Sequence, residues 1–408
     1  MSTPMSTPMS SATEAGTLRL ATAGSVDDGK STLVGRLLHD SKSVLADQLE
    51  SISRTGTPDL ALLTDGLRAE REQGITIDVA YRYFATPRRR FILADTPGHV
   101  QYTRNMVTGA STAELTIILV DARNGVVEQT RRHAAIAALL RVPHLVLAVN
   151  KMDLVGYEEA VFAATAEEFT AYATELGVPR VTAIPVSALA GDNIVDPSAH
   201  MDWYGGPTVL EHLETVPVAA AAPDTPARFP VQYVIRHDES RYYAGQLASG
   251  TLRVGDPITV HPSGRTSTIA ALDVLGTAVD AARAGESLTA RLADELDVAR
   301  GDLLAPSTGP APSVTRDIRG AVCHLADEPL VVGQRVLLRH TTRTVKAIVR
   351  SLADADRLTA NDLGHVVLRT AEPVVVDDYA EIRWTGAFLL LDPADGTTLT
   401  AGMAELPR

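Results

Sequence analysis

The sequence predicts a multidomain α/β and β protein, in which an α/β domain with a parallel-rich sheet and helices on both faces is followed by two small β-barrels. From residue 18 to about 213, short apolar β-rich runs alternate with helical stretches, which is typical of such a sheet. After an Ala/Pro-rich segment at 216–230, short strand-like runs separated by turn residues replace the long helices. The 408 residues are also too many for one ordinary core.

The elements of the α/β part follow from its apolar runs. We expect strands at 18–23, 91–94, 116–120, 145–149 and 181–186, and helices at 30–39, 129–140, 158–176 and 208–214. Open α/β sheets bind ligands outside the carboxyl ends of their strands. The polar motifs that follow these strands are therefore the candidate functional residues.

Composition shifts predict the domain boundaries. The Met-Ser-Thr-Pro repeat at 1–15 lacks the basic start and apolar centre of a secretion signal, so we expect a disordered leader. We place the α/β domain at 16–222. The Gly/Pro-rich break at 305–313 then divides the remainder into barrels at 223–306 and 307–408.

Charge and composition argue against several classes of function. The net charge of −13 disfavours a broad nucleic-acid surface, and no apolar run is long enough to span a bilayer. The single cysteine, Cys323, excludes an intrachain disulfide and is expected to be a buried small residue. We expect a cytoplasmic protein without a nucleic-acid or membrane partner.

A phosphate-binding loop follows the first predicted strand. Residues 24–31, GSVDDGKS, match the pattern GxxxxGK followed by Ser or Thr, between a strand and a helix. Lys30 should reach the β- and γ-phosphates, and the Ser31 hydroxyl should bind Mg²⁺. The predicted phosphate-loop residues are Gly24, Ser25, Val26, Asp27, Asp28, Gly29, Lys30, Ser31 and Thr32.

A second motif, DTPGH, ends the strand at 91–94. Asp95 can hold a magnesium-bound water, and the Gly98 N–H can meet a γ-phosphate. The predicted site residues of this motif are Asp95, Thr96, Pro97, Gly98 and His99.

The base-reading motif selects guanine. The Asp153 carboxylate can accept hydrogen bonds from both N1–H and the 2-amino group of guanine, whereas adenine offers neither donor there. Asn150 and Lys151 would position the purine, and the segment after the fifth strand would supply a backbone N–H to the guanine oxygen. The predicted residues are Asn150, Lys151, Met152, Asp153, Ser187, Ala188 and Leu189. The three motifs together predict GTP and GDP as ligands.

These motifs resemble those of the translational GTPase superfamily, which includes the bacterial elongation factors. The resemblance implies an elongation-factor-like architecture and a first switch at 71–84, in which Thr76 would close on Mg²⁺. His99 resembles the residue that orients the attacking water, so Lys30, Thr76 and His99 are the predicted catalytic residues. Ser31, Thr76 and Asp95 would hold Mg²⁺. Asp27 matches a position associated with a monovalent cation.

The phosphate loop departs from the elongation-factor spelling GHVDHGKT at Ser25, Asp28 and Ser31. With the segments 68–84 and 101–114, these residues resemble the GTPase subunit of bacterial sulfate adenylyltransferase. The resemblance implies a heterodimer or higher assembly with a small subunit that binds ATP and sulfate and transfers the adenylyl group. GTP hydrolysis on this chain would then drive the formation of adenylyl sulfate and pyrophosphate.

Two alternatives remain open. One is a tRNA-carrying elongation-factor-like GTPase, which the shared architecture favours but the altered phosphate loop and acidic total oppose. The other is an orphan GTPase that has lost its sulfate partner.

Overall fold

The computed structural model describes residues 16–41, 79–99, 103–217, 225–237, 240–353 and 355–407. The chain divides into two compact units, residues 1–218 and 219–408, which are described separately below. Within the described ranges, no helix has both the length and the apolar character needed to cross a membrane.

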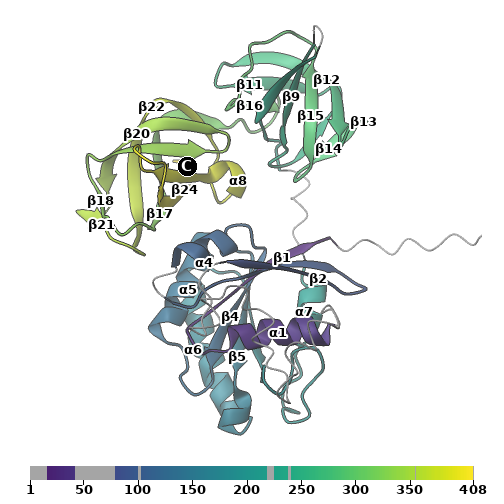
Figure 1. The fold of residues 1–408 in the computed structure, drawn as a ribbon, viewed down its shortest axis with the longest axis vertical. Helices are drawn as coiled ribbons and strands as arrows, with labels where there is room; N and C mark the ends of the chain where they lie inside the picture. The colour runs from purple at the N-terminus through teal and green to yellow at the C-terminus, as the bar shows by residue number, and fades with distance from the viewer. Residues whose placement is uncertain are drawn as a thin grey trace, which may run out of the picture. The chain divides into compact units, whose positions relative to one another are not determined.

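The first unit is built on a six-stranded sheet with the strand order β2-β3-β1-β4-β5-β6 (Figure 1). All neighbouring strands are parallel except the edge pair β2 and β3, which is antiparallel. The parallel-rich sheet is thus confirmed, and its edge strand β2 overlaps the end of the segment that resembles the first switch. The strands are β1 (Leu18–Gly24), β2 (Ala80–Ala85), β3 (Arg90–Asp95), β4 (Leu115–Asp121), β5 (His144–Asn150) and β6 (Val181–Pro185).

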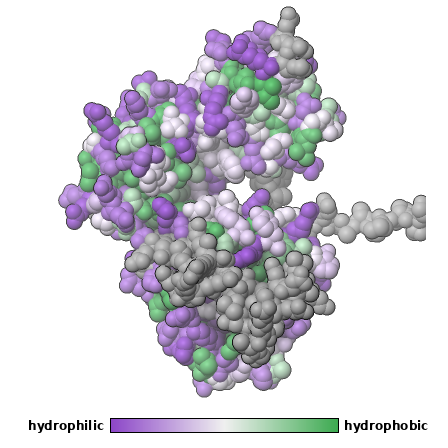
Figure 2. All heavy atoms as spheres, in the orientation of Figure 1, coloured by the Kyte–Doolittle hydropathy of each residue, from purple (hydrophilic) through white to green (hydrophobic). Residues whose placement is uncertain are grey.

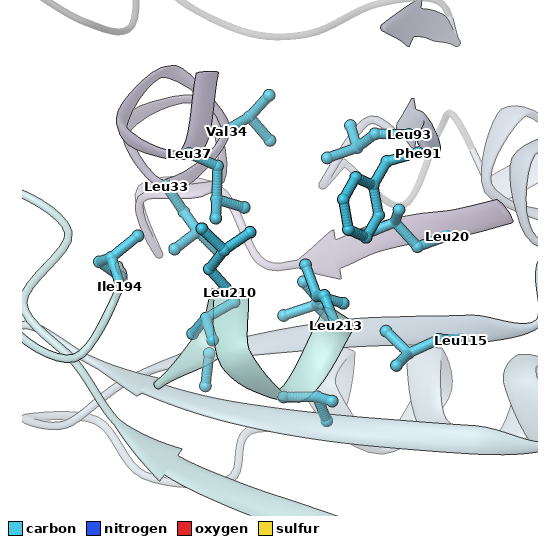
Figure 3. Packing of buried hydrophobic residues seen from close by; sticks show 14 of the residues in the cluster. Leu20, Leu33, Val34, Leu37, Phe91, Leu93, Leu115, Ile194, Leu210 and Leu213 are labelled. Carbon is cyan, nitrogen blue, oxygen red and sulfur yellow. The ribbon is translucent and has the colours of Figure 1, made fainter. Parts of the chain in front are cut away.

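Helices cover both faces of this sheet, as the sequence predicts. Helices α1 and α7 pack on one face around a buried cluster that includes Leu33, Leu37, Phe91 and Leu213 (Figure 3). Helices α4, α5 and α6 contact strands β3, β4 and β5. Each fully buried side chain of this kind contributes about 1.5–3 kcal/mol of hydrophobic free energy. The helical elements are α1 (Lys30–Asp40), α4 (Thr103–Ala110), α5 (Glu128–Leu139), the 3₁₀ turn η3 (Met152–Val155), α6 (Glu159–Glu175) and α7 (Val209–Thr215).

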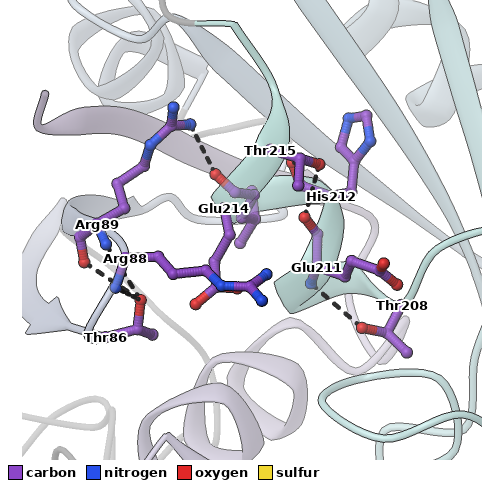
Figure 4. Close-up of polar contacts among 9 residues, drawn as sticks. Thr86, Arg88, Arg89, Thr208, Glu211, His212, Glu214 and Thr215 are labelled. Carbon is purple, nitrogen blue, oxygen red and sulfur yellow. Dashed lines mark hydrogen bonds and ion pairs between the residues drawn. The ribbon is translucent and has the colours of Figure 1, made fainter. Parts of the chain in front are cut away.

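The turn between β2 and β3 is hydrogen-bonded to the C-terminal end of α7. Figure 4 shows Arg88 and Arg89 of this turn beside Glu214 of α7. The guanidinium Nη1 of Arg89 donates to the backbone carbonyl oxygens of Leu213, at 2.8 Å, and Val216, at 2.7 Å. Arg88 forms an ion pair of 3.2 Å with Glu214. The last carbonyls of a helix have no partner inside the helix, so Arg89 satisfies groups that would otherwise need water. The end of α7 is therefore attached to the sheet edge.

The first β-rich part of the second unit is an eight-stranded sheet around one apolar core. Its order is β7-β16-β11-β12-β15-β9-β8, with β13 paired to β12. Among the described residues, the outer strands β7 and β8 do not pair with each other. The strands are β7 (Phe229–Pro230), β8 (Tyr233–His237), β9 (Ser240–Gln246), β11 (Pro257–His261), β12 (Arg265–Val274), β13 (Thr277–Val279), β15 (Ser287–Leu292) and β16 (Leu303–Pro306), beside a ribbon of β10 (Thr251–Arg253) and β14 (Ala281–Arg283).

The second β-rich part is a closed barrel of six strands, in the order β17-β22-β20-β19-β23-β24. It has its own core, and Cys323 is buried in β17 as expected. Hydrophobic residues on the visible surface of the β-rich parts are interspersed with hydrophilic ones (Figure 2). The elements are β17 (Ser313–His324), β19 (Arg335–His340), β20 (Arg343–Leu352), β22 (Leu363–Val376), the short helix α8 (Arg383–Gly386), β23 (Ala387–Leu391) and β24 (Thr398–Ala404), with a separate ribbon of β18 (Leu330–Val331) and β21 (Arg357–Leu358).

A buried ion pair joins the two β-rich parts. Arg228, only 1% exposed, donates from Nε and Nη2 to the Asp377 carboxylate at 3.0 Å. The same carboxylate accepts the Thr385 hydroxyl at 2.6 Å, and Arg228 Nη2 also reaches the Pro310 carbonyl oxygen at 2.9 Å. The charges are thus compensated inside one polar cluster. The domain boundaries at 222/223 and 306/307 remain predictions.

Candidate nucleotide site

The predicted phosphate loop lies between β1 and α1. Helix α1 begins at Lys30, directly after Gly29, whose φ of 94° favours glycine. Asp28 is buried and accepts the Ser25 backbone N–H on its carboxylate Oδ2 at 2.6 Å, which closes the loop from inside. Burial raises the pKa of Asp28, although the Ser25 N–H and the charge of Lys30 oppose this effect. The loop precedes a helix N-terminus, where backbone N–H groups favour an anion.

Lys30 lies inside this loop. Its Nζ donates to the carbonyl oxygens of Gly24, at 2.8 Å, and Ser25, at 2.7 Å. Burial lowers the pKa of Lys30, whereas the carboxylates of Asp28, Asp95 and Asp27 raise it. A Cβ added to Gly98 would lie 2.3 Å from this ammonium nitrogen and 2.6 Å from the Gly24 oxygen. Gly98 therefore brings its backbone close to the phosphate loop in a way that no other residue could.

Asp95 ends β3 with a buried carboxylate. Its Oδ1 accepts the Thr22 hydroxyl of neighbouring β1 at 2.9 Å, and the Thr96 hydroxyl donates to the Thr22 carbonyl oxygen at 2.5 Å. The register that places Thr22 opposite Asp95 in parallel strands makes the first contact possible. Thr22 orients Asp95, a role that the motif alone did not indicate.

The base-reading loop is hydrogen-bonded to the phosphate loop. Asn150 is buried at the end of β5, and its Nδ2 donates to the Asp28 carbonyl oxygen at 2.7 Å. Its Oδ1 accepts the Ala188 backbone N–H at 2.9 Å. A Cβ on Gly29 would lie 2.4 Å from the Asn150 amide nitrogen. Asn150 thus connects the loops that follow β1, β5 and β6.

Asp153 and Ser187 also lie together. The Ser187 hydroxyl donates to Asp153 Oδ1 at 2.6 Å, which fixes the orientation of the carboxylate that is predicted to read guanine. Ser187 and Ala188 are buried, whereas Leu189 is exposed. Met152 is buried beneath the loop and packs as a core residue.

Lys151 is positioned by a carboxylate that the sequence analysis missed. Its Nζ lies 2.9 Å from Asp121 Oδ2 and donates to the Asp27 carbonyl oxygen at 2.5 Å. Arg123 binds the same Asp121 carboxylate through Nε at 3.0 Å and Nη2 at 2.6 Å. Burial by itself raises the pKa of Asp121, but the hydrogen bonds from Arg123 and Lys151 outweigh it and lower the pKa well below its usual range. Asp121 comes directly at the end of β4, a strand-end position that could have drawn attention to it.

Arg36 on α1 is a further residue that the motifs did not indicate. Its Nε donates to the Ala188 carbonyl oxygen at 3.3 Å and its Nη2 to the Leu189 carbonyl oxygen at 2.5 Å. These contacts attach helix α1 to the loop after β6.

One predicted residue, Thr76, lies outside the described residues, and some others are exposed. His99 is exposed at the end of its motif, and Val26 is exposed on the phosphate loop. Thr32, Pro97 and Thr96 lie in the expected segments, with Pro97 and Thr96 buried.

The residues present fit a magnesium ion that is shared with phosphates. Mg²⁺ prefers oxygen ligands and commonly uses one or two protein groups, while phosphates and water supply the rest. Asp95 offers a buried, oriented carboxylate, and Ser31 offers a hydroxyl at the first turn of α1. Within the described ranges, no group of three or more His, Cys, Asp or Glu side chains forms a protein-only metal cage.

Two segments of the chain match known protein families. Residues 16–228 match the elongation factor Tu GTP binding domain, and residues 317–405 match the GTP-eEF1A C-terminal domain-like family. The chain is 52% identical to the bifunctional enzyme CysN/CysC of Mycobacterium tuberculosis over 410 residues, covering 95% of this chain and 67% of that enzyme. It is 47% identical to the bifunctional enzyme NodQ of a Rhizobium species, covering 96% of this chain and 65% of that enzyme.

The chain matches a third relative over most of that relative's length. The chain is 48% identical over 409 residues to sulfate adenylyltransferase subunit 1 of Yersinia pestis, which covers 95% of this chain and 85% of that subunit. By contrast, it spans about two thirds of the bifunctional enzymes. The chain therefore belongs to the sulfate adenylyltransferase subunit 1 family, whose GTP-binding domain is of the elongation factor Tu type.

Proposed function

We propose that this chain hydrolyses GTP and couples the hydrolysis to the formation of adenylyl sulfate and pyrophosphate from ATP and sulfate. Family membership across 95% of the chain supports this proposal. The observation that supports GTP binding is that Asn150 is hydrogen-bonded to both Asp28 and Ala188. These bonds hold the phosphate loop and the loops proposed to bind guanine in one cluster.

Guanine recognition falls to the loops after β5 and β6. Asp153, oriented by the Ser187 hydroxyl, would accept the N1–H and 2-amino protons. The Ala188 region, fixed by Asn150 and Arg36, would donate a backbone N–H to the guanine oxygen. Lys151, held by Asp121, would lie along the purine ring.

Phosphate recognition and hydrolysis fall to the loops after β1 and β3. Lys30 would exchange its two carbonyl contacts for the β- and γ-phosphates. Ser31, Thr76 and Asp95 are the residues that would hold Mg²⁺, which neutralises charge on the phosphate oxygens. His99 would orient the attacking water from its exposed position. A monovalent cation near Asp27 stays a prediction.

The adenylyl transfer itself is assigned to a separate small subunit, in a heterodimer or larger assembly. The motifs of this chain provide for one guanine nucleotide and include nothing suited to ATP and sulfate. Formation of the mixed anhydride of adenylate and sulfate is unfavourable, so it has to share conformational states with a favourable reaction. We place the assembly in the cytoplasm, without nucleic acid or membrane as partner.

The deciding experiment is to purify the chain with the small subunit that co-expression captures. Adenylyl sulfate formed from ATP and sulfate is then measured with GTP, with GDP and with a non-hydrolysable GTP analogue. We expect the yield of adenylyl sulfate to rise with GTP but not with GDP or the analogue. We expect the chain without the small subunit to form no adenylyl sulfate. Ser31→Ala should weaken the coupling because it removes a magnesium ligand, whereas Glu175→Gln at the far end of α6 should not. Equal yields with all three nucleotides would overturn the coupling.

The tRNA-carrying alternative has a separate readout. An elongation-factor-like carrier would retain aminoacyl-tRNA on a filter in the presence of GTP. The net charge of −13 disfavours this outcome, because phosphate contacts dominate nucleic-acid affinity. Retention of aminoacyl-tRNA without GTP-dependent adenylyl sulfate formation would select the alternative.

A further inference from the structure

Asp28 is an unusual residue for a phosphate-binding loop. Such loops bind phosphate through backbone N–H groups and a lysine, so a carboxylate among them places like charges together. Two successive aspartates occur here, and they differ in environment. Asp27 is exposed, whereas Asp28 is 5% exposed and therefore lies inside the loop.

The contacts of Asp28 give the carboxylate a structural task. Its Oδ2 accepts the Ser25 backbone N–H at 2.6 Å, and its backbone N–H approaches the Ser25 carbonyl oxygen at 3.4 Å. Its own carbonyl oxygen accepts Asn150 Nδ2 at 2.7 Å. The side chain thus closes the turn of the loop while the main chain attaches that turn to the base-reading loop.

The charge of Asp28 is not needed for this task. A neutral oxygen at the same position would also accept the Ser25 N–H, although less strongly. The two nearby ammonium groups are directed elsewhere, because Lys30 donates to Gly24 and Ser25 and Lys151 binds Asp121. Within residues 16–41, 79–99 and 103–217, Asp28 forms no ion pair within 4 Å. Lys30 and Lys151 therefore act on its negative charge only without direct contact, and among these described residues the carboxylate keeps no ion-pair partner where a polyphosphate would bind.

We propose that Asp28 is a positioning residue with two separable effects, in which its oxygen holds the phosphate loop closed and its charge weakens the loop's grip on nucleotide phosphates. This inference rests on the proposed function. The first effect keeps the loop in its binding shape, and the second speeds the release of GDP. The chain would thus exchange its nucleotide by itself, at the expense of affinity.

The two effects predict different results for two substitutions. Asp28→Asn keeps the shape and the acceptor oxygen but removes the charge, whereas Asp28→Ala removes both. We expect Asp28→Asn to bind GTP and GDP about tenfold more tightly and to release GDP more slowly by a similar factor. Asp28→Ala should bind both nucleotides more weakly than Asp28→Asn, because the Ser25 N–H loses its partner.

The measurement is equilibrium binding of GTP, GDP, GMP and guanosine by calorimetry, with GDP release followed by a fluorescent analogue. A charge effect increases with the number of phosphates, so Asp28→Asn should tighten GTP most and leave guanosine unchanged. A purely structural effect would change all four ligands alike. Glu175→Gln, an equal charge change on exposed α6, is the matched control and should bind as the wild type does.

The outcomes separate this inference from the function on which it rests. If the wild-type chain binds no guanine nucleotide, the proposed function fails. If the wild type binds GTP but Asp28→Asn binds GTP and GDP no more tightly, the charge effect is wrong. Equal tightening of guanosine and GTP would also contradict it. If Asp28→Ala binds every ligand as tightly as Asp28→Asn does, the oxygen does not hold the loop closed.

Discussion

The side-chain amide of Asn150 donates to the backbone carbonyl oxygen of Asp28 at 2.7 Å, although 122 residues separate them in the sequence. This bond lies between the loop that is predicted to read the base and the loop that is predicted to bind the phosphates. A Cβ on the next residue, Gly29, would lie 2.4 Å from the same amide nitrogen. The two recognition loops therefore cannot rearrange independently, and substitutions in either should affect both parts of the nucleotide.

We expect Asp153→Asn to shift base preference from guanine toward xanthine, because an amide can donate to the 2-oxo group that a carboxylate repels. GTP affinity should fall by about 1–3 kcal/mol, since a charge-assisted pair of hydrogen bonds is left unmatched. A competition titration of GTP against xanthosine triphosphate measures both changes. Asp196→Asn, on an exposed loop, is the control. Unchanged GTP affinity would remove Asp153 from the site.

His99→Ala should lower the rate of GTP hydrolysis and leave GTP affinity nearly intact. The side chain is exposed, and its predicted role concerns the attacking water and not the bound nucleotide. Single-turnover hydrolysis and equilibrium binding of a labelled GTP analogue separate the two quantities. Much weaker binding by the variant would show that His99 does not act by positioning water.

Sequence reasoning predicted the sheet of the first unit well because its buried strands are continuous apolar runs. Strand β2 was not predicted, since it exposes alternate residues at the sheet edge and Tyr81 and Tyr83 face outward. Helix α4 was also missed. In the site, the motifs could place Lys30 at the start of a helix and Asp95 at the end of a strand.

The partners of those motif residues could not be predicted from spacing. Arg36 meets Ala188 across 152 residues, and Thr22 meets Asp95 across 73, through sheet register and helix packing. Such contacts depend on how elements face one another in space. The closure of the last barrel depends likewise on pairing between β17 and β24, which are far apart in the chain.

Breaking the buried pair of Arg228 and Asp377 should strongly destabilise the second unit. Asp377→Ala leaves the guanidinium buried without its carboxylate, which costs about 3–5 kcal/mol. Replacing both residues, as Arg228→Met with Asp377→Leu, should recover much of this loss. Urea unfolding followed by Trp384 fluorescence in a Trp203→Phe background reports on this unit.

The matched control is the exposed ion pair of Arg369 and Asp317, whose side chains are 44% and 56% exposed. Asp317→Ala should cost no more than about 1 kcal/mol. If Asp377→Ala costs as little as Asp317→Ala, the buried pair does not join the two β-rich parts in solution.

The first unit should lose stability in mild acid because of His133. Burial, with the charges of Lys30 and Arg132, lowers the pKa of this α5 histidine to about 3, and Gln129 Nε2 lies 3.0 Å from its Nε2. An unfolded histidine has a pKa of about 6.5. Since the unfolded state binds the proton first, the stabilisation is full above pH 6.5 and is lost as the pH falls toward 3.

The expected contribution of His133 is a fall of about 1.4 kcal/mol in unfolding free energy per pH unit below 6.5. Unfolding curves at pH 7, 6 and 5, followed by Trp203 fluorescence in a Trp384→Phe background, measure it. In His133→Gln, the unfolding free energy should depend less steeply on pH than in the wild type. His200→Gln, which alters an exposed histidine, should keep the wild-type dependence. Parallel curves for wild type and His133→Gln would contradict the prediction.

The hydrogen bonds from Arg89 fix the turn of the β2–β3 hairpin to the end of α7. Strand β3 is about 20 Å long, with the Asp95 motif at one end and the Arg89 turn at the other. A strand inside a hydrogen-bonded sheet resists stretching and bends little over such a length. The strand and its turn therefore connect the Asp95 motif to Val216 at the end of α7, two residues before the first unit ends at residue 218.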